Sequence, residues 1–199
     1  MNYLAHAYLS FRHPGILVGN MISDYVKGNK KFDYPTAIQQ GIQLHRNIDQ
    51  FTDQHEVTRQ VKEIFKASYR LYSGAFADVV YDHFLANDLT EFNDGNLFEF
   101  SQWAYKNLGD HELFFPEKFK NMYPYMKQQN WLYNYRLRSG MEKSFGGLVR
   151  RAAYLTESDT AFRLFEENYD SLRSYYQSFF PDIKNFAFAR LQEIQLNDQ

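Results

Sequence analysis

Residues 34–53 have the sequence YPTAIQQGIQLHRNIDQFTD, whose pattern is typical of a single amphipathic helix. One row along such a helix recurs at intervals of three or four residues and contains Ile38, Ile42, His45 and Asp49. The adjacent row is apolar and contains Leu44, Ile48 and Phe51. Because an apolar helix face packs against a core, we expect His45 and Asp49 to lie at the border of a core rather than in open solvent.

The same helical spacing of apolar residues continues through most of the chain, whereas the alternation typical of half-buried strands is hard to find. The sequence therefore predicts an all-α fold, a single-domain bundle of about eight to ten helices over residues 1–199. Breaks between helices are expected at Pro124 and Pro181, because proline lacks a backbone donor. One stripe predicts a continuous amphipathic helix and consists of Phe165, Tyr169, Leu172, Tyr176 and Phe179.

The composition excludes several classes of site. The chain contains no cysteine, which rules out disulfides, thiolate zinc sites, iron–sulfur clusters and a cysteine nucleophile. Any metal must therefore be bound by histidine, aspartate or glutamate. The 22 basic and 24 acidic side chains give a formal net charge of −2, which disfavours a nucleic-acid partner.

The apolar runs of the chain are short. They fall well below the roughly 20 residues that a membrane-spanning helix needs. The N-terminus also lacks the basic region and long apolar stretch of a secretory signal. We therefore expect a cytoplasmic protein without a membrane partner.

A second predicted helix, from Gly74 to about Leu89, carries acidic residues on a largely apolar surface. Asp78 and Asp82 are one turn apart in a row that continues with Leu85. Burying an ionised aspartate without a partner costs several kcal/mol or forces its protonation. A cation or a network of donors should therefore face these carboxylates, and a divalent metal is the simplest candidate.

Two further residues are candidates for the same site: His6, in the apolar opening of the chain, and Asp24, in a segment that begins at Pro14. Taken singly, His6 could be a core histidine bonded to a backbone carbonyl, and Asp24 could cap a helical turn. Arg46 could simply neutralise a nearby aspartate. A purely structural explanation must, however, supply partners for seven polar groups at once: His6, Asp24, His45, Asp49, Asp78, Asp82 and His83.

Residue spacing excludes several known templates. The chain has no Glu-x-x-His pair of a di-iron bundle, and His111-Glu112 is not followed by the second histidine of a zincin. Neither a phosphate-binding glycine loop nor a Gly-x-Ser-x-Gly elbow occurs. What remains is a helical His/Asp site suited to hard or borderline cations such as Mn²⁺, Mg²⁺ or Fe²⁺.

Four blocks within about the first 90 residues carry a family resemblance. They are Asn2-Tyr3-Leu4-Ala5-His6, Gly19-Asn20 followed by Asp24, the segment Gly41 to Asp53 with His45-Arg46 and Asp49, and Asp78 followed by Asp82-His83-Phe84-Leu85-Ala86. These blocks resemble the acyl carrier protein phosphodiesterase family, which is related to HD-domain phosphohydrolases. The resemblance implies an HD-like helical fold and a metal-dependent hydrolysis, commonly with Mn²⁺. The reaction would cleave the phosphodiester between 4′-phosphopantetheine and a serine of holo acyl carrier protein, leaving the apo carrier.

Together with this resemblance, the residues predict roles within one site. A metal can neutralise the phosphate, activate a water and assist the departing alkoxide. The expected metal ligands are Asp24, His45, Asp49 and Asp78. The expected catalytic groups are His6 as acid or hydrogen-bond anchor, Asp82 and His83 as orienting groups, and Arg46 as a phosphate contact. Residues 1–90 would hold the metal, and residues 91–199 would form the rim that meets the substrate.

The segment from Asn134 to Arg151 is a candidate docking surface for an acidic carrier protein. It has one acidic residue, Glu142, against five basic residues, Arg136, Arg138, Lys143, Arg150 and Arg151, which gives five minus one, or +4. The alternative is a solvated charged helix that binds nothing.

Two other functions remain open at this stage. The first is an HD-like phosphohydrolase that uses the same metal site on a nucleotide or another small phosphoester. The second is a helical protein that binds a metal or ligand without turnover, in which the aromatic residues line an apolar cavity. Hydrolysis of nucleotides, or ligand retention without hydrolysis, would distinguish them.

Overall fold

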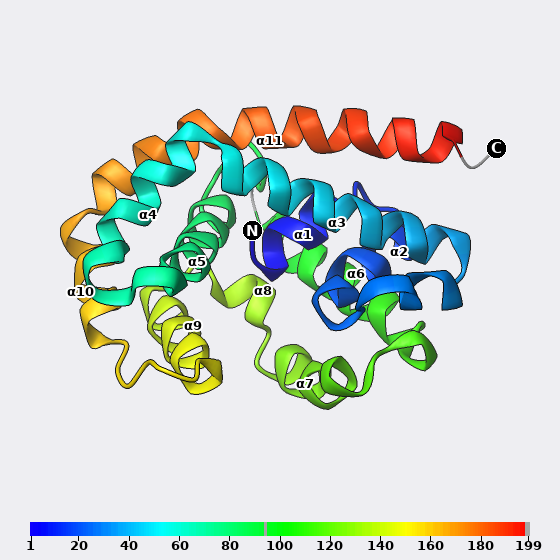
Figure 1. The fold of residues 1–199 in the computed structure, drawn as a ribbon, viewed down its shortest axis with the longest axis horizontal. Coiled ribbons are helices and arrows are strands. Elements are labelled where there is room, and N and C mark those ends of the chain that lie inside the picture. Colours follow the sequence, from blue (N-terminus) through cyan, green and yellow to red (C-terminus); the bar gives the residue numbers. More distant parts are fainter. Residues whose placement is uncertain (94, 198–199) are drawn as a thin grey trace.

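The computed structural model describes residues 1–93 and 95–197, so Asp94, Asp198 and Gln199 of the predicted domain lie outside the described residues. Within the described ranges the chain is helical and contains no strand, which confirms the predicted all-α bundle (Figure 1). Its α-helices are α1 (Tyr3–Tyr8), α2 (Pro14–Ile22), α3 (Thr36–Gln54), α4 (Glu56–Tyr69), α5 (Ser73–Ala86), α6 (Asn96–Gly109), α7 (Glu117–Gln128), α8 (Trp131–Asn134), α9 (Arg138–Arg151), α10 (Asp159–Glu167) and α11 (Tyr169–Asn197). Short 3₁₀ helices are η1 (Ser23–Tyr25), η2 (Gly28–Asp33), η3 (Arg70–Tyr72) and η4 (Glu112–Phe114).

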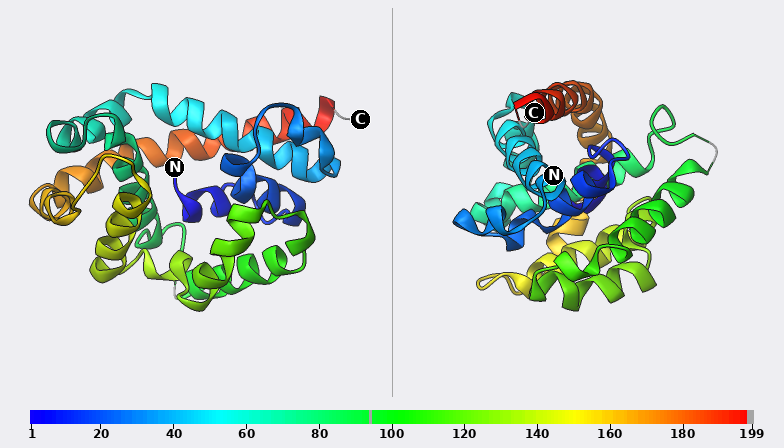
Figure 2. Two further views of the ribbon diagram at one scale, coloured as in Figure 1. Left: turned by 60° about the horizontal axis from the view of Figure 1, so that its bottom comes forward. Right: turned by 90° about the vertical axis from the view of Figure 1, so that its right-hand side faces the viewer.

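The helices form layers around the short helix α1. Helices α3, α4 and α11 lie together along one side, and α7 and α9 lie on the opposite side (Figures 1 and 2). Helix α1 packs against α2 and α5 between them. This arrangement buries the N-terminal segment at the centre of the bundle, where Leu4, Ala5 and Ala7 have no exposed surface.

Helices α2 and α3 cross at backbone contact, and two glycines make this possible. A Cβ atom on Gly19 would lie 2.0 Å from the carbonyl oxygen of Ile38, and one on Gly41 would lie 2.3 Å from that of Ile16. Neither distance is sterically allowed for a side chain, so both positions require glycine. The close crossing brings the polar residues of α2 and α3 into direct contact.

The two helices that the sequence singled out are confirmed with shifted ends. The stretch predicted over residues 34–53 forms α3, which begins at Thr36, and the stretch from Gly74 forms α5, which ends at Ala86. Pro35 stands at the N-cap of α3, where its missing N–H costs nothing.

The predicted stripe from Phe165 to Phe179 does pack inward, but the expected single helix is wrong. The chain breaks at Asn168, whose side-chain amide donates to the carbonyl of Leu164 at 2.8 Å and terminates α10. Helix α11 then starts at Tyr169. The apolar face continues across the break because the two helices pack against the same core.

The breaks expected at the two prolines are also wrong. Pro124 lies inside α7 and Pro181 lies inside α11. Proline in a helix interior costs about 3 kcal/mol. Here the neighbouring side chains Phe180 and Ile183 are buried in the core, so packing holds α11 together across the lost hydrogen bond. In the described ranges, no helix combines the length and apolar character that crossing a membrane requires.

Candidate functional site

Three of the predicted polar residues converge where α1 meets α3. The Nε2 atom of His6 lies 3.2 Å from Oδ1 of Asp49, and Nε2 of His45 lies 3.0 Å from Oδ2 of the same carboxylate. The two imidazole rings stack with their centroids 3.9 Å apart. The ligand atoms of these three residues lie within 4.8 Å of one another, so the group could hold a metal ion.

Asn20 orients both imidazoles from the adjacent helix α2. Its side-chain oxygen accepts a hydrogen bond from Nδ1 of His6 at 2.8 Å, while its backbone carbonyl accepts one from Nδ1 of His45 at 2.7 Å. The amide nitrogen of Asn20 donates to the carbonyl of His6 and to Ser10 Oγ, which leaves the side-chain oxygen as the acceptor for the ring. The backbone of Asn20 reaches the ring of His45 because Gly19 allows α2 to touch α3.

These hydrogen bonds determine which ring nitrogen is free. With a proton held on Nδ1, each neutral imidazole carries its lone pair on Nε2. Both lone pairs face the Asp49 carboxylate, which is itself an acceptor. In addition, Nε2 of His6 is fully buried and has no hydrogen-bond partner in the described part of the chain. Three acceptors that face one another are satisfied only by a proton or a cation, and histidines held at Nδ1 in this way are typical of metal ligands.

The charges of the group are strongly coupled. Burial and the neighbouring His45 lower the pKa of His6 to about 4. Burial also acts to lower the pKa of His45, but its contacts with Asp24 and Asp49 dominate and raise it to about 9. Against the opposing effect of burial, His6 and His45 hold the pKa of Asp49 far below its usual range. Without a cation, the raised pKa places the shared proton on Nε2 of His45, between the carboxylates of Asp24 and Asp49. A bound cation would take the place of this proton.

Asp24 extends the group toward solvent. It belongs to η1, directly after α2, and its Oδ1 lies 3.1 Å from Nε2 of His45. Its side chain is 69% exposed, whereas His6 and His45 are almost completely buried. The hydrogen bond with His45 lowers the pKa of Asp24. An ionised carboxylate therefore stands at the open edge of the group.

Asp78 reaches the group only through the chain's first residue. Its Oδ1 accepts a hydrogen bond from the α-amino group of Met1 at 2.9 Å, and this amino group lies 3.5 Å from Oδ1 of Asp49. Burial raises the pKa of Asp78. His6 therefore contacts Asp49 directly, whereas Asp78, which the sequence predicts as a metal ligand, does not.

Asp82 lies outside the group, although it is one turn from Asp78 on α5. Its two oxygens accept hydrogen bonds from the backbone amides of Leu4 and Ala5 at 2.7 and 3.0 Å. Burial raises the pKa of Asp82 to about 7, although these two amides act in the opposite direction. Its contacts therefore anchor the start of α1, which carries His6.

His83 and Arg46 also point away from the group. His83 donates from Nδ1 to the carbonyl of Tyr135 at 2.7 Å and lies 3.0 Å from the hydroxyl of Tyr169 through Nε2. Burial lowers the pKa of His83 to about 4. The Nη2 atom of Arg46 donates to the carbonyl of Val26 at 3.0 Å. The sequence predicts His83 as an orienting group and Arg46 as a phosphate contact. A helix turns by about 100° per residue, however, so His83 and Arg46 face other neighbours than Asp82 and His45.

The sequence alone predicts no role in the site for Asn20. Asn20 could have been noticed in the sequence because it is a polar residue between Gly19 and Met21 in an otherwise apolar helix. Recognising the role requires knowledge that the two glycines allow α2 and α3 to touch, which helical periodicity does not reveal.

The chain is similar to known proteins over most of its length. A family model described as acyl carrier protein phosphodiesterase matches residues 1–183. The chain is 30% identical over 182 residues to a protein named acyl carrier protein phosphodiesterase from Photorhabdus laumondii, covering 91% of this chain and 92% of that protein. A protein of the same name from Klebsiella pneumoniae is 30% identical over 188 residues, covering 94% and 97% of the two chains.

The match spans the residues of the candidate site and most of the C-terminal helices. No solved structure shows a significant match to the chain, so the expected kinship with HD-domain proteins stays a prediction. Both the family model and the curated relatives cover nearly the whole length of the chain. The chain therefore belongs to the acyl carrier protein phosphodiesterase family.

Proposed function

We propose that this protein hydrolyses the phosphodiester bond between 4′-phosphopantetheine and the serine of holo acyl carrier protein, and that it does so with a divalent cation, preferably Mn²⁺. The observation that carries the proposal is the pair of imidazoles held at Nδ1 by Asn20, with both Nε2 atoms facing Asp49. The family's name supplies the substrate class, and the site supplies the chemistry. We also propose the cytoplasm as the location, on the sequence argument given above.

The donor set fits a divalent cation. His6, His45 and Asp49 would hold it, and Asp24 would add a carboxylate oxygen from the open edge. Two imidazoles with one or two carboxylates suit Mn²⁺ or Fe²⁺ better than an all-oxygen site would. When bound, the cation would neutralise charge on the phosphate and make water more acidic.

The chain's own residues prepare the site for this reaction. Asn20 fixes the tautomer and the orientation of both imidazoles, so the donors need no rearrangement. The ionised Asp24 stands on the solvent side, where a substrate phosphate and water can enter. Asp82 secures α1 and thereby the position of His6.

A direct test is to incubate metal-stripped protein with holo acyl carrier protein, with and without Mn²⁺, and to measure the mass of the carrier. We expect the carrier to lose the mass of the phosphopantetheine group only when Mn²⁺ is added. A panel of nucleotides and small phosphodiesters should be tested in parallel. Hydrolysis of nucleotides without hydrolysis of the holo carrier would contradict the proposal and favour the small-phosphoester alternative.

The same assay needs a control for folding. Asp49→Asn removes a proposed ligand charge, and Asp53→Asn makes the same change one turn further along α3, where Asp53 is exposed and pairs with Lys62 at 2.6 Å. We expect Asp49→Asn to abolish cleavage and Asp53→Asn to retain it. Equal activity in the two variants would remove Asp49 from the site.

A further inference from the structure

A pocket of about 490 Å³ opens between α8, α9 and the segment that precedes α1. Among the described residues that line it, none is acidic. Aromatic rings and side-chain amides form much of its wall: Tyr3, Trp131, Tyr135, Asn2, Gln129 and Asn134. Its basic side chains come from α9 and are Lys143, Arg150 and Arg151. The pocket shares no residue with the metal-binding group, so it is a separate feature of the fold.

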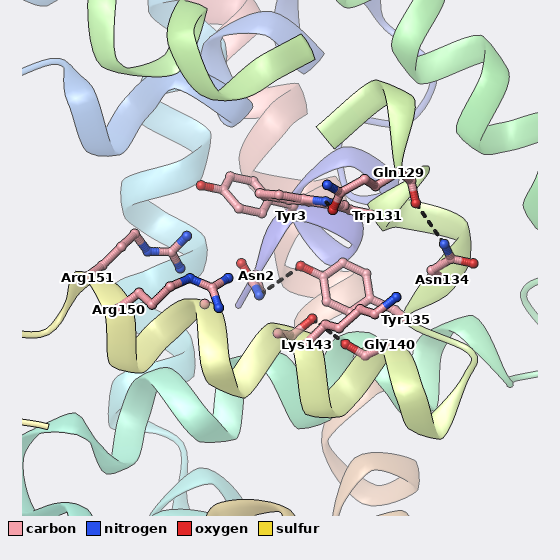
Figure 3. Close-up of a pocket in the computed structure, with 12 residues that line it drawn as sticks. Asn2, Tyr3, Gln129, Trp131, Asn134, Tyr135, Gly140, Lys143, Arg150 and Arg151 are labelled. Carbon is pink, nitrogen blue, oxygen red and sulfur yellow. Dashed lines mark hydrogen bonds between the residues drawn. The ribbon is translucent and has the colours of Figure 1, made fainter. Parts of the chain in front are cut away.

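The pocket has two chemically different ends (Figure 3). Arg150 and Arg151 lie at one end, and Gln129 and Asn134 lie at the other, with Tyr3 and Tyr135 between them. Within residues 1–93 and 95–197, neither of these arginines forms an ion pair, and neither does Lys143. Arg150 and Arg151 therefore place two unpaired positive charges at one end, whereas the other end carries the side-chain amides of Gln129 and Asn134 together with the amino group of Lys143.

The charged end is the one that lies toward the metal-binding group. Tyr3 lines the pocket and is one turn before His6 on α1. Its hydroxyl lies 3.0 Å from the hydroxyl of Tyr25, the residue after Asp24. In Figure 3 the hydroxyl of Tyr3 points toward the end that holds Arg150 and Arg151, so Tyr3 connects the arginine end with the open edge of the group.

We propose that this pocket binds the pantetheine arm of the substrate, with the phosphate at the arginine end and the amide-bearing chain extending toward Gln129 and Asn134. The inference rests on the proposed function, which supplies the arm. Pantetheine is an uncharged chain with two amide bonds between apolar carbons. Side-chain amides can pair with its amides, and the rings of Tyr3 and Trp131 can cover its apolar parts. Arg150 and Arg151 match the negative phosphate.

Two adjacent glycines of α9 provide a matched pair of variants. Gly147 lines the pocket, and a Cβ atom there would meet only the Arg150 side chain, at 3.7 Å. Gly146 is not part of the lining, and its Cβ would meet Arg150 and Ser158 at 3.6 and 3.7 Å. Both contacts are ordinary van der Waals distances. Gly147→Leu therefore fills the pocket, and Gly146→Leu makes the same change on the same helix outside it.

The first measurement is kcat/KM for holo acyl carrier protein and for bis(p-nitrophenyl) phosphate, which has no pantetheine arm. We expect Gly147→Leu to lower kcat/KM for the carrier by about tenfold or more relative to Gly146→Leu, and to lower kcat/KM for the small diester by a smaller factor. If wild-type protein cleaves the carrier and the two variants do so equally well, the pocket inference is overturned and the proposed function stands. If wild-type protein does not cleave the carrier, both are overturned.

A second measurement detects the ligand without any catalysis. The chain has two tryptophans, so Trp103→Phe leaves Trp131 as the only one, and its fluorescence reports on the pocket. Free pantetheine is the probe. We expect a saturable change in emission in Trp103→Phe and in its combination with Gly146→Leu, and none with Gly147→Leu. No change in Trp103→Phe, or an equal change in both combined variants, would overturn the inference.

Discussion

Asn20 carries most of the organisation of the site at the scale of single residues. One side-chain oxygen and one backbone carbonyl hold two histidines in the same tautomer. Asn20 supplies the partner of Nδ1 in both His6 and His45, and both histidines point Nε2 toward Asp49. A residue that touches no substrate in this account therefore decides whether the ligand atoms can converge.

Replacing Asn20 should weaken metal binding. Asn20→Ala removes the acceptor of His6 Nδ1 and leaves this ring free to reorient, while the backbone bond to His45 remains. We expect affinity for Mn²⁺ to fall about 10- to 100-fold and the free energy of unfolding to fall by about 1–3 kcal/mol. Titration of the metal-stripped protein with Mn²⁺ measures the first effect.

Ser10→Ala is the control for this change. Ser10 Oγ donates to the carbonyl of His6 and accepts from the Asn20 amide, so it belongs to the same network but touches no ring nitrogen. This variant should lose stability and keep its affinity for Mn²⁺. An equal loss of affinity in both variants would show that the network acts through folding rather than through the orientation of His6.

The sequence predicted most of the residues that meet at the site, but not their partners. Helical spacing identified His45 and Asp49 on one row, because both lie on the same helix. Helical spacing could not show that Asp82 and Asp78 have different partners. The partners of Asp82 are the backbone amides of Leu4 and Ala5, nearly 80 positions away in the sequence. Contacts between distant segments depend on how helices cross, and a single periodic pattern contains no information about that.

At the scale of secondary-structure elements, the crossing of α2 and α3 is the decisive contact. Gly19 and Gly41 allow the two helices to touch through their backbones. The carbonyl of Asn20 can reach His45 only at this separation. Stability and site geometry therefore depend on the same two positions.

Gly19→Ala tests this dependence. The added Cβ would lie 2.0 Å from the Ile38 carbonyl, so α2 must move away from α3. We expect a loss of about 1–3 kcal/mol in the free energy of unfolding, together with weaker Mn²⁺ binding. Chemical denaturation and metal titration measure the two effects.

Gly74→Ala is the matched control, because the new Cβ would meet only the flexible end of Lys62, at 3.4 Å. This variant should be as stable as wild type, or more stable by about 0.4–1 kcal/mol. A Gly19→Ala protein that is equally stable and binds Mn²⁺ normally would disprove the close-crossing explanation.

His83 connects α5 to the chain after α8 and to the start of α11, and it makes stability depend on pH. Burial lowers its pKa to about 4, from an ordinary value of 6.5. Between these values the unfolded chain binds a proton that the folded chain does not. His83 therefore contributes a loss of stability as the pH falls from about 6.5 to 4, up to about 3 kcal/mol.

Denaturation of wild type and His83→Gln across this pH range measures the contribution. The difference in unfolding free energy between them should shrink as the pH falls. A difference that stays constant from pH 7 to pH 4 would show that folded His83 accepts the proton, contrary to the burial argument.

Local sequence patterns predicted the helices more reliably than their ends. The apolar stripe from Phe165 to Phe179 packs as expected, but Asn168 divides it, and Pro181 does not end α11. The basic segment around α9 shows the same limit, because Arg138 pairs with Glu166 of α10. Counting charges along the sequence does not reveal such ion pairs. In the described part of the chain, Lys143, Arg150 and Arg151 face the pocket without an ion-pair partner.

The whole molecule combines a nearly neutral total charge with a locally basic face. The formal net charge is −2, yet the pocket side of α9 presents three cations, and the described residues that line the pocket include no acid. An acidic carrier protein would be attracted to this face over a distance comparable with the Debye length, about 10 Å at 0.1 M salt. Recognition of the carrier should therefore depend on ionic strength.

We expect KM for holo acyl carrier protein to rise several-fold between about 50 and 300 mM NaCl, with little change in kcat, because salt screens the encounter rather than the reaction. Steady-state kinetics at several salt concentrations measures this effect, and bis(p-nitrophenyl) phosphate serves as the substrate without a docking surface. A KM for the carrier that does not respond to salt would argue against the basic face as its docking site.

The central claim is that hydrolysis requires a cation held by His6, His45 and Asp49. The most direct measurement is a titration of metal-stripped protein with Mn²⁺, in which electron paramagnetic resonance reports bound Mn²⁺ and the mass of holo acyl carrier protein reports turnover in the same samples. We predict that turnover rises in proportion to bound Mn²⁺ in wild type and Asp53→Asn, and that Asp49→Asn loses both. Full turnover in the stripped protein with chelator present, or in Asp49→Asn without bound metal, would contradict the account.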